Sequence, residues 1–279
     1  MIILSNVFSY SKIGTYKNCP HSYYLTYIEK NKRNNGVYGQ LGSKLHSIME
    51  ELEHNKMSKS DALELWNSEV SYMELMDELN FPTENSKKNY IEDVRLYLNN
   101  FEPIDFNGRD VGVEDHFKIK IKDEYLLQGY IDLYIIDHDK KEIEIVDYKT
   151  SSKSGFTKSH LLEKCYQLIL YALALENKYP DYKIIKTSFD MVKYAIHNKT
   201  GKVKERKDIS PNEILDYKRY FISVDYNEEN KNKLLEYISN NINEIEDLNK
   251  QNIDVWKPVK NKFFCDNLCS MKQYCKYSK

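Results

Sequence analysis

The sequence lacks the features that would place it in a membrane or a secretory pathway. No stretch of 18 consecutive apolar residues occurs, so we expect no membrane-spanning helix. The first ten residues contain no basic segment followed by a long apolar run, so we expect no signal peptide and a cytoplasmic protein. The chain also has no internal repeat and no long linker. Its 279 residues are enough to bury a substantial core, and we predict a single domain over residues 1–279.

Cysteine is scarce, and the number of cysteines is odd. Five cysteines in a cytoplasmic chain argue against a disulfide framework, because thiols stay reduced in that compartment. Three of the five, Cys265, Cys269 and Cys275, fall within the last fifteen residues. This concentration indicates a metal site at the end of the chain.

The periodicity of the apolar residues predicts an α/β fold. Helical spacing predicts helices over residues 41–52, 60–79, 87–101, 161–175 and 234–248. Alternation of apolar and polar residues predicts strands over residues 111–121, 126–136, 143–148 and 189–196. Residues 8–28 are interpreted as a short helix and turn, and residues 34–42 as a loop rich in glycine and asparagine. The pattern indicates one α/β domain with a helical insertion at about 50–105.

Four short fragments that contain potential metal ligands or other potential active-site residues follow one another along the chain. Three of them end an apolar stretch with a metal-ligand residue, and the fourth lies on a predicted helix. The fragments are Gly42-Ser43-Lys44-Leu45-His46, Gly129-Tyr130-Ile131-Asp132, Asp147-Tyr148-Lys149-Thr150 and Gln167-Leu168-Ile169-Leu170-Tyr171. Asp-x-Lys alone is common on exposed strands as a solvated pair, and a lone histidine at a helix start is often a surface residue. The ordered set is therefore the informative observation.

The spacing of these residues predicts a shared metal site. Asp147 and Lys149 are two apart on a predicted strand, so both side chains project from the same face of the sheet. Asp132 lies on the neighbouring strand, close enough to share an ion with Asp147. Two carboxylates and the imidazole of His46 suit Mg²⁺ or Mn²⁺. Such an ion polarises a phosphate and lowers the pKa of a bound water, and a nearby lysine stabilises the developing charge. The set is typical of a metal-dependent phosphodiesterase that cuts nucleic acid.

These motifs, from about Phe8 to Cys275, resemble the RecB-like branch of the PD-(D/E)XK nucleases. The resemblance implies a restriction-endonuclease-like core, with a central mixed β-sheet flanked by helices. It implies that His46, Asp132 and Asp147 bind the divalent ion together with the backbone carbonyl of Tyr148. Lys149 would be the catalytic lysine, and Asp132 and Asp147 would share the catalytic role.

The resemblance also assigns residues around this centre. Gln167 and Tyr171, four apart on one helix face, would line the site and contact DNA. Glu114, on the strand before Asp132, matches an acidic position found in many members and is a further candidate metal ligand. An ordinary surface glutamate is the alternative interpretation of Glu114.

Cys19 and the three late cysteines supply enough ligands for a 4Fe–4S cluster or a tetrahedral zinc ion. One early and three late cysteines resemble the iron–sulfur members of this branch, namely CRISPR-associated adaptation exonucleases and AddB-type nuclease domains. In those proteins the cluster joins the two ends of the domain, here residues 8–30 and 255–279. The late cysteines contain no Cys-x-x-Cys, which favours iron–sulfur over a zinc ribbon. Cys165 falls outside the pattern and is interpreted as a free thiol.

Positive charge is concentrated at the two ends of the chain. The net charge of −2 argues against a uniformly basic nucleic-acid coat. Residues 1–44 and residues 255–279, however, each contain six Lys or Arg and one acidic residue. A cluster joining the ends would merge them into one cationic surface. Such a surface binds phosphates without sequence preference, and we expect DNA, single-stranded or at duplex ends, as the partner.

The sequence thus predicts a Mg²⁺- or Mn²⁺-dependent DNA exonuclease, with endonuclease activity left open. Recombination, repair, phage DNA processing and CRISPR adaptation are the candidate processes, in a bacterial, archaeal or phage-infected cell. No Gly-x-x-x-x-Gly-Lys-Ser/Thr phosphate loop occurs, so a helicase motor would be a separate partner, as would a recombination or adaptation protein. Oligomerisation is left open. The alternative function is a non-catalytic nucleic-acid-binding module with a structural metal cluster, acting as a subunit of a helicase–nuclease complex.

Overall fold

The computed structural model describes residues 6–278 except 105, 107, 123–124, 158, 252 and 260. These residues form two compact units. The first unit takes its residues from Met1–Gly36, His116–Tyr130 and Asn227–Lys279. The second takes them from Val37–Asp115 and Ile131–Tyr226. Each unit is described separately below.

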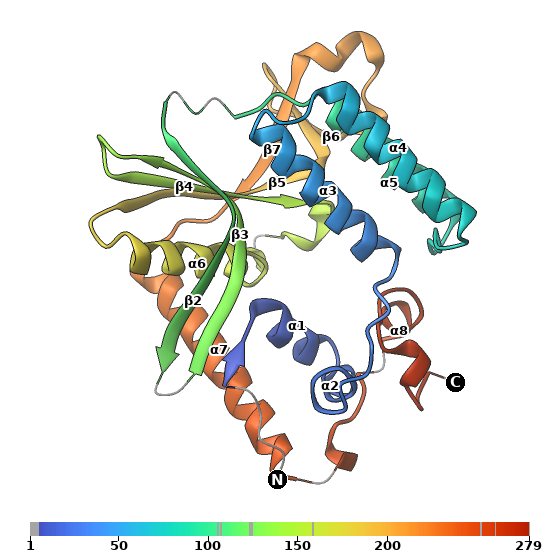
Figure 1. The fold of residues 1–279 in the computed structure, drawn as a ribbon, viewed down its shortest axis with the longest axis vertical. Coiled ribbons are helices and arrows are strands. Elements are labelled where there is room, and N and C mark those ends of the chain that lie inside the picture. Colours follow the sequence, from blue (N-terminus) through green and yellow to red (C-terminus); the bar gives the residue numbers. More distant parts are fainter. Residues whose placement is uncertain are drawn as a thin grey trace. The chain divides into compact units, whose positions relative to one another are not determined.

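The second unit begins with three consecutive helices. They are α3 (Val37–Glu53), α4 (Lys59–Leu75) and α5 (Glu84–Asn99), and α4 lies beside both α3 and α5 (Figure 1). Capping boxes at Ser58 and Thr83 fix the starts of α4 and α5, since each cap hydroxyl accepts from a backbone N–H in the first turn. The apolar sides of the three helices enclose a core around Trp66.

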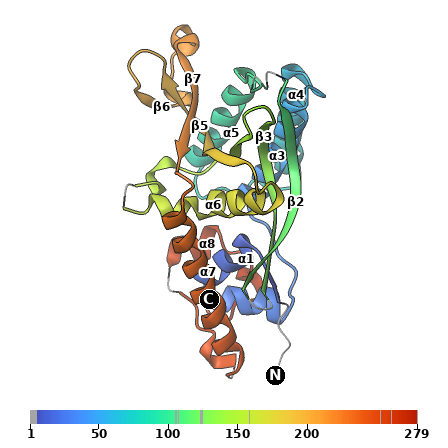
Figure 2. The ribbon, with the colours of Figure 1, turned by 90° about the vertical axis from the view of Figure 1, so that its left-hand side faces the viewer.

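The strands pair in one mixed sheet. The strands of the second unit are parts of β2 (Asp110–Lys122) and β3 (Tyr125–Asp137), then β4 (Glu142–Lys149), β5 (Lys183–His197), β6 (Val203–Glu205) and β7 (Tyr217–Ser223). β3 and β4 are antiparallel, and β4 and β5 are parallel. The crossover from β4 to β5 contains helix α6 (Leu161–Lys178), which packs against both strands (Figure 2). Strand β4 is therefore central, which explains why Ile145, Val146, Asp147 and Tyr148 are all buried.

The first unit brings together segments from both ends of the chain. Strand β1 (Val7–Phe8) pairs in parallel with the start of β3. Helices α1 (Tyr10–Asn18) and α2 (Pro20–Tyr23) precede a π-helical turn, and α7 (Glu228–Asn249) and α8 (Lys262–Asn267) come from the C-terminal part. Tyr23 stacks on Trp256 with ring centroids 5.7 Å apart, and the Asn34 N–H donates to the Ser270 carbonyl.

The glycine of the Gly-x-Ile-Asp fragment has a packing reason within this unit. A Cβ at Gly129 would lie 2.9 Å from the ring of Phe117 on the adjacent strand. The ring of Phe117 can lie over the backbone at position 129 only because glycine has no side chain there.

The predicted fold class is confirmed: helices flank a central mixed sheet. The loop predicted over residues 34–42 was wrong at its end, because α3 already begins at Val37. Val37, Leu41, Leu45 and Ile48 follow at helical spacing and are all buried, so packing outweighs the roughly 1 kcal/mol that each glycine costs in a helix. Among the described residues, no helix combines the length and apolar character needed to cross a membrane.

Candidate active site

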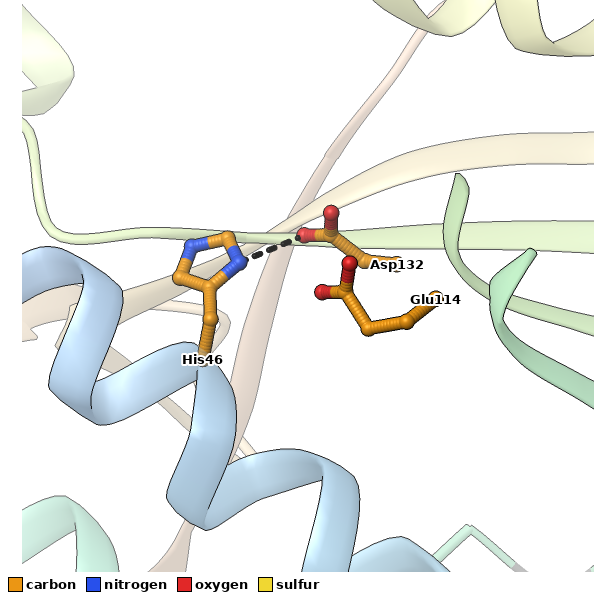
Figure 3. A group of neighbouring side chains, drawn as sticks. All are labelled: His46, Glu114 and Asp132. Atoms are coloured by element: carbon orange, nitrogen blue, oxygen red, sulfur yellow. Dashed lines mark ion pairs between the residues drawn. The ribbon is translucent and has the colours of Figure 1, made fainter. Parts of the chain in front are cut away.

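Three side chains from separate elements of the second unit converge on one point. His46 comes from α3, Glu114 from β2 and Asp132 from β3, and one ligand atom of each lies within 4.8 Å of the others (Figure 3). The His46 Nδ1 atom is 3.1 Å from Asp132 Oδ2. One imidazole nitrogen and two carboxylates form a donor set that suits a divalent metal ion.

The local backbone explains how Glu114 reaches this point. Its φ of 48° lies in the left-handed region, which a residue with a side chain adopts at a cost of about 1–3 kcal/mol. Such a residue interrupts the strict alternation of side chains along a strand and redirects one of them. The strain at Glu114 is what an oriented ligand residue would show. His46, in contrast, needs only the regular geometry of α3.

The electrostatics of the three residues favour bound positive charge. Burial disfavours protonation of His46, but its hydrogen bond to Asp132 and the nearby carboxylates outweigh burial, so the pKa of His46 is raised. Burial raises the pKa of Asp132, and the hydrogen bond to His46 reverses this, so the pKa of Asp132 is lowered. The pKa of Glu114 is raised by burial and by the charge on Asp132. A cation at this point would relieve the repulsion between the two carboxylates.

Asp147 lies next to this group but is not part of it. The β3–β4 register pairs Leu133 with Val146, so Asp132 and Asp147 follow one step beyond that pair, on the same face. Asp147 is fully buried, and burial together with the Asp132 charge raises its pKa to about 7. The backbone N–H of the next residue, Tyr148, donates to Asp132 Oδ2 at 3.2 Å.

Lys149 is held by partners on two sides. Its Nζ atom lies 2.5 Å from Asp147 Oδ1 and donates to Gln167 Oε1 at 3.0 Å. Gln167 in turn donates from Nε2 to the Tyr171 hydroxyl at 2.6 Å. Both α6 residues named by the sequence motif therefore lie in a chain that ends at Lys149. Tyr171 is only 5% exposed, so it holds the Gln167 side chain through a hydrogen bond from the protein interior.

Four of the five cysteines line a single cavity within the first unit. The cavity has a volume of about 520 Å³, and its wall includes Cys19, Cys265, Cys269 and Cys275. Cys165, in the second unit, is fully buried, and burial raises its pKa to about 12. No three of the five cysteine sulfurs, all of which are described, lie within 4.8 Å of one another. The cavity therefore holds the cysteines around a space rather than against each other.

A group of buried charged side chains next to β4 was missed by the sequence reasoning. Glu53, Asp190 and Arg219 form ion pairs on the side of β4 opposite Asp147. One signal was available, because Asp190 interrupts the apolar run Phe189-Asp190-Met191-Val192 on a predicted strand. A charged residue at such a position requires a buried partner.

Comparison with models of known protein families gives a match over nearly the whole chain. Residues 7–276 match the model of the PD-(D/E)XK nuclease superfamily. A search of curated proteins gave no significant match. The matched range includes the His46–Glu114–Asp132 group, Asp147, Lys149 and all five cysteines.

Proposed function

Because this chain belongs to the PD-(D/E)XK nuclease superfamily, we propose that it is a DNA exonuclease of the RecB-like branch. Membership confirms the superfamily expected from the motifs and implies metal-dependent nuclease activity. The observation that carries the proposal is the arrangement of Asp132, Asp147 and Lys149 beside His46. An intact set of this kind favours catalysis over the alternative of a non-catalytic binding module.

We propose His46, Glu114 and Asp132 as ligands of Mg²⁺ or Mn²⁺. Their ligand atoms are close enough for one ion, and the donor set of one nitrogen and two oxygens fits such an ion. Asp147 and the backbone carbonyl of Tyr148 are proposed as additional ligands, on the basis of the family resemblance and of the position of Asp147 beside Asp132. The bound ion would polarise the phosphate and acidify the attacking water.

The residues of the chain then have separate roles. Asp147 would orient the water on the face of the sheet that it shares with Lys149. Lys149, already fixed by Asp147 and Gln167, would stabilise the negative charge that develops on the phosphate oxygens. Because the amine is held before substrate arrives, little reorganisation is needed during the reaction.

We further propose that the cysteine cavity binds a 4Fe–4S cluster through Cys19, Cys265, Cys269 and Cys275. Tetrahedral zinc requires ligand sulfurs about 3.8 Å apart, which follows from a Zn–S bond of about 2.3 Å. The cysteine sulfurs do not form such a close group, whereas a four-iron cluster needs a larger space between its ligands. The cavity has room for the cluster, and the absence of a Cys-x-x-Cys among the late cysteines is unlike most zinc ribbons and supports the cluster over zinc.

The proposed substrate is DNA, in recombination, repair, phage DNA processing or CRISPR adaptation. The lysines of the C-terminal segment, among them Lys262 and Lys272 in the wall of the cysteine cavity, support phosphate contacts near the proposed cluster. A helicase, or a recombination or adaptation protein, is proposed as a separate partner.

The test is a cleavage assay with Mn²⁺ on end-labelled single-stranded and double-stranded DNA, with closed circular DNA in parallel. We expect loss of the end label from linear DNA, with slow or no cutting of the circle. The matched controls are Lys149→Ala, which should be inactive, and Lys164→Ala, which removes an exposed lysine of α6 and should leave the rate unchanged. Absence of cleavage of every DNA substrate, or equal activity of Lys149→Ala, would reject the proposal.

A further inference from the structure

We infer that a buried ion network behind β4 positions the metal centre by tying the helix of His46 to the strand of Asp147. The network consists of Glu53, Tyr97, Tyr148, Asp190 and Arg219. The inference rests on the proposed metal site and extends it to side chains that do not contact the ion.

The contacts of the network form a continuous chain. The Tyr148 hydroxyl donates to Glu53 Oε1 at 2.7 Å, and Arg219 Nη1 is 3.4 Å from the same oxygen. Arg219 Nε is 2.5 Å from Asp190 Oδ2, and the Tyr97 hydroxyl donates to that oxygen at 2.5 Å. Five elements, α3, α5, β4, β5 and β7, are thereby joined through hydrogen-bonded side chains.

The network is buried, so its geometry is strongly specified. Glu53 is 2% exposed and Asp190 is fully buried. Buried charges are stable only when they are paired, and removing one partner leaves the other without compensation.

The position of Tyr148 connects the network to the proposed catalytic residues. Tyr148 lies between Asp147 and Lys149, and its side chain projects from the opposite face, into the core formed by α3 and α5. A shift of this side chain would move the backbone that carries both neighbours.

Glu53 makes the corresponding connection on the helix. It follows His46 by seven residues, which is close to two turns, so both lie on the same side of α3. The bond from Tyr148 to Glu53 therefore ties the helix of His46 to the strand of Asp147, in addition to the apolar contacts of α3 in the same core. His46 Nδ1 lies 3.1 Å from Asp132, so a shift of α3 relative to the sheet would change the geometry of the proposed metal site.

Tyr97, another tyrosine of the network, provides a matched control for a substitution of Tyr148. The Tyr97–Asp190 bond is also a buried tyrosine hydroxyl donating to a carboxylate, but it joins α5 to β5. Neither element carries a proposed metal ligand. Tyr97→Phe and Tyr148→Phe thus remove the same chemical group from equally buried positions, and only the second releases the link between α3 and β4.

The experiment measures Mn²⁺ affinity of the purified full-length chain by electron paramagnetic resonance, together with its melting temperature. We expect both variants to lower the melting temperature. Only Tyr148→Phe should weaken Mn²⁺ binding, by about tenfold or more, as is usual for residues that orient metal ligands. Tyr97→Phe should stay within about twofold of the unaltered protein. Excess Mn²⁺ should restore most of the cleavage rate of Tyr148→Phe.

The outcomes separate the inference from the proposed function. If the unaltered protein does not bind Mn²⁺, the metal site itself is rejected. If it binds Mn²⁺ and both variants bind equally well, or are weakened equally, the positioning role is overturned. Should Tyr148→Phe fail to fold, Glu53→Asp replaces it, because it keeps the charge for Arg219 but withdraws the acceptor from Tyr148. Unchanged Mn²⁺ affinity of Glu53→Asp would then overturn the inference.

Discussion

Lys149 donates a hydrogen bond from Nζ to the side-chain oxygen of Gln167 at 3.0 Å. The bond joins the end of β4 to the first half of α6, which lies in the crossover from β4 to β5. A lysine side chain has four rotatable bonds, and its mobility in water would spread the amine over many positions. Gln167, itself held by Tyr171, limits the amine to one of them. The Gln-x-x-x-Tyr motif therefore has a structural role toward Lys149.

We predict that Gln167→Leu lowers the cleavage rate at saturating Mn²⁺ by about ten- to a hundredfold, because Lys149 loses its neutral acceptor. Mn²⁺ affinity should not change, since Gln167 lies outside the proposed ligand set. Tyr171→Phe, which removes the support behind Gln167, should have a smaller effect. Single-turnover rates and Mn²⁺ titrations of both variants provide the measurement. A weaker effect for Gln167→Leu than for Tyr171→Phe would contradict the proposed order of contacts, in which Tyr171 acts on Lys149 through Gln167.

Asp147→Ala and Lys149→Ala should each abolish cleavage and leave the fold intact. Loss of the carboxylate or the amine removes on the order of 3–4 kcal/mol of transition-state stabilisation, or at least a hundredfold in rate. Circular dichroism tests whether the fold is intact, and cleavage kinetics with Mg²⁺ and with Mn²⁺ test the loss of activity. A variant with the rate of the unaltered protein would disprove the assignment of that residue.

Protein purified without oxygen should be brown, with broad absorbance near about 400 nm and about four irons per chain, as expected for a thiolate-bound 4Fe–4S cluster. A colourless protein with one zinc per chain would instead support the zinc alternative. Elemental analysis decides between them, and neither metal in anaerobic preparations would exclude a metal role for the cysteine cavity.

Cys19→Ala should lower the melting temperature and weaken DNA binding. If Cys19 shares a cluster with the late cysteines, the binding energy of the metal site contributes to folding and also fixes the two basic ends of the chain. Cys165→Ala removes only a buried thiol, which changes the free energy of unfolding by on the order of 1 kcal/mol. Melting curves and salt titrations of DNA binding compare the two. A silent Cys19→Ala beside a damaging Cys165→Ala would show that the ligand set is wrong.

Asp93 should make the stability of the metal-free protein depend on pH. Its carboxyl is fully buried on α5 and accepts one bond from the Lys207 N–H, while Oδ2 has no hydrogen-bond partner among the residues that the structure describes. Burial raises its pKa from 3.8 to about 6. The folded state therefore holds more protons than the unfolded state between about pH 4 and pH 6. The stabilisation is complete below the unfolded pKa and is lost as pH rises through this window.

The size of this effect is on the order of 2–3 kcal/mol, from a shift of about two pKa units at about 1.4 kcal/mol each. Urea denaturation with a chelator, at pH values from 4 to 7, should show Asp93→Asn gaining stability relative to the unaltered protein as pH rises. A difference between the two proteins that does not vary with pH would mean that Asp93 is already ionised in the folded state.

The linear pattern of the chain was sufficient for its fold class and for the main elements. Long helices such as α5 and α6 and the strands β3 and β4 lie where the pattern of apolar residues predicted them. The start of α3 was missed because the glycines near Gly42 disfavour a helix locally. The burial of Val37 and Leu41 outweighs this preference.

The candidate residues of the site were also available from the sequence, since metal ligands and the catalytic lysine depend on residue type and on spacing within one strand or helix. Asp147 with Lys149, and Gln167 with Tyr171, are such pairs. What joins these pairs to each other is not local. Lys149 meets Gln167 only because the β4–α6–β5 crossover lays the helix on the strand.

The tertiary structure alone decided which carboxylates lie together and what supports them. Glu114 joins His46 and Asp132 because its backbone takes a left-handed conformation that redirects the side chain, and no spacing rule anticipates that turn. The ties between Glu53 and Tyr148 and between Asp190 and Arg219 likewise connect residues far apart in the chain. Their energy comes from pairing buried charges. The apolar run around Asp190 indicates that this charge is buried, but only the fold determines which groups pair with it.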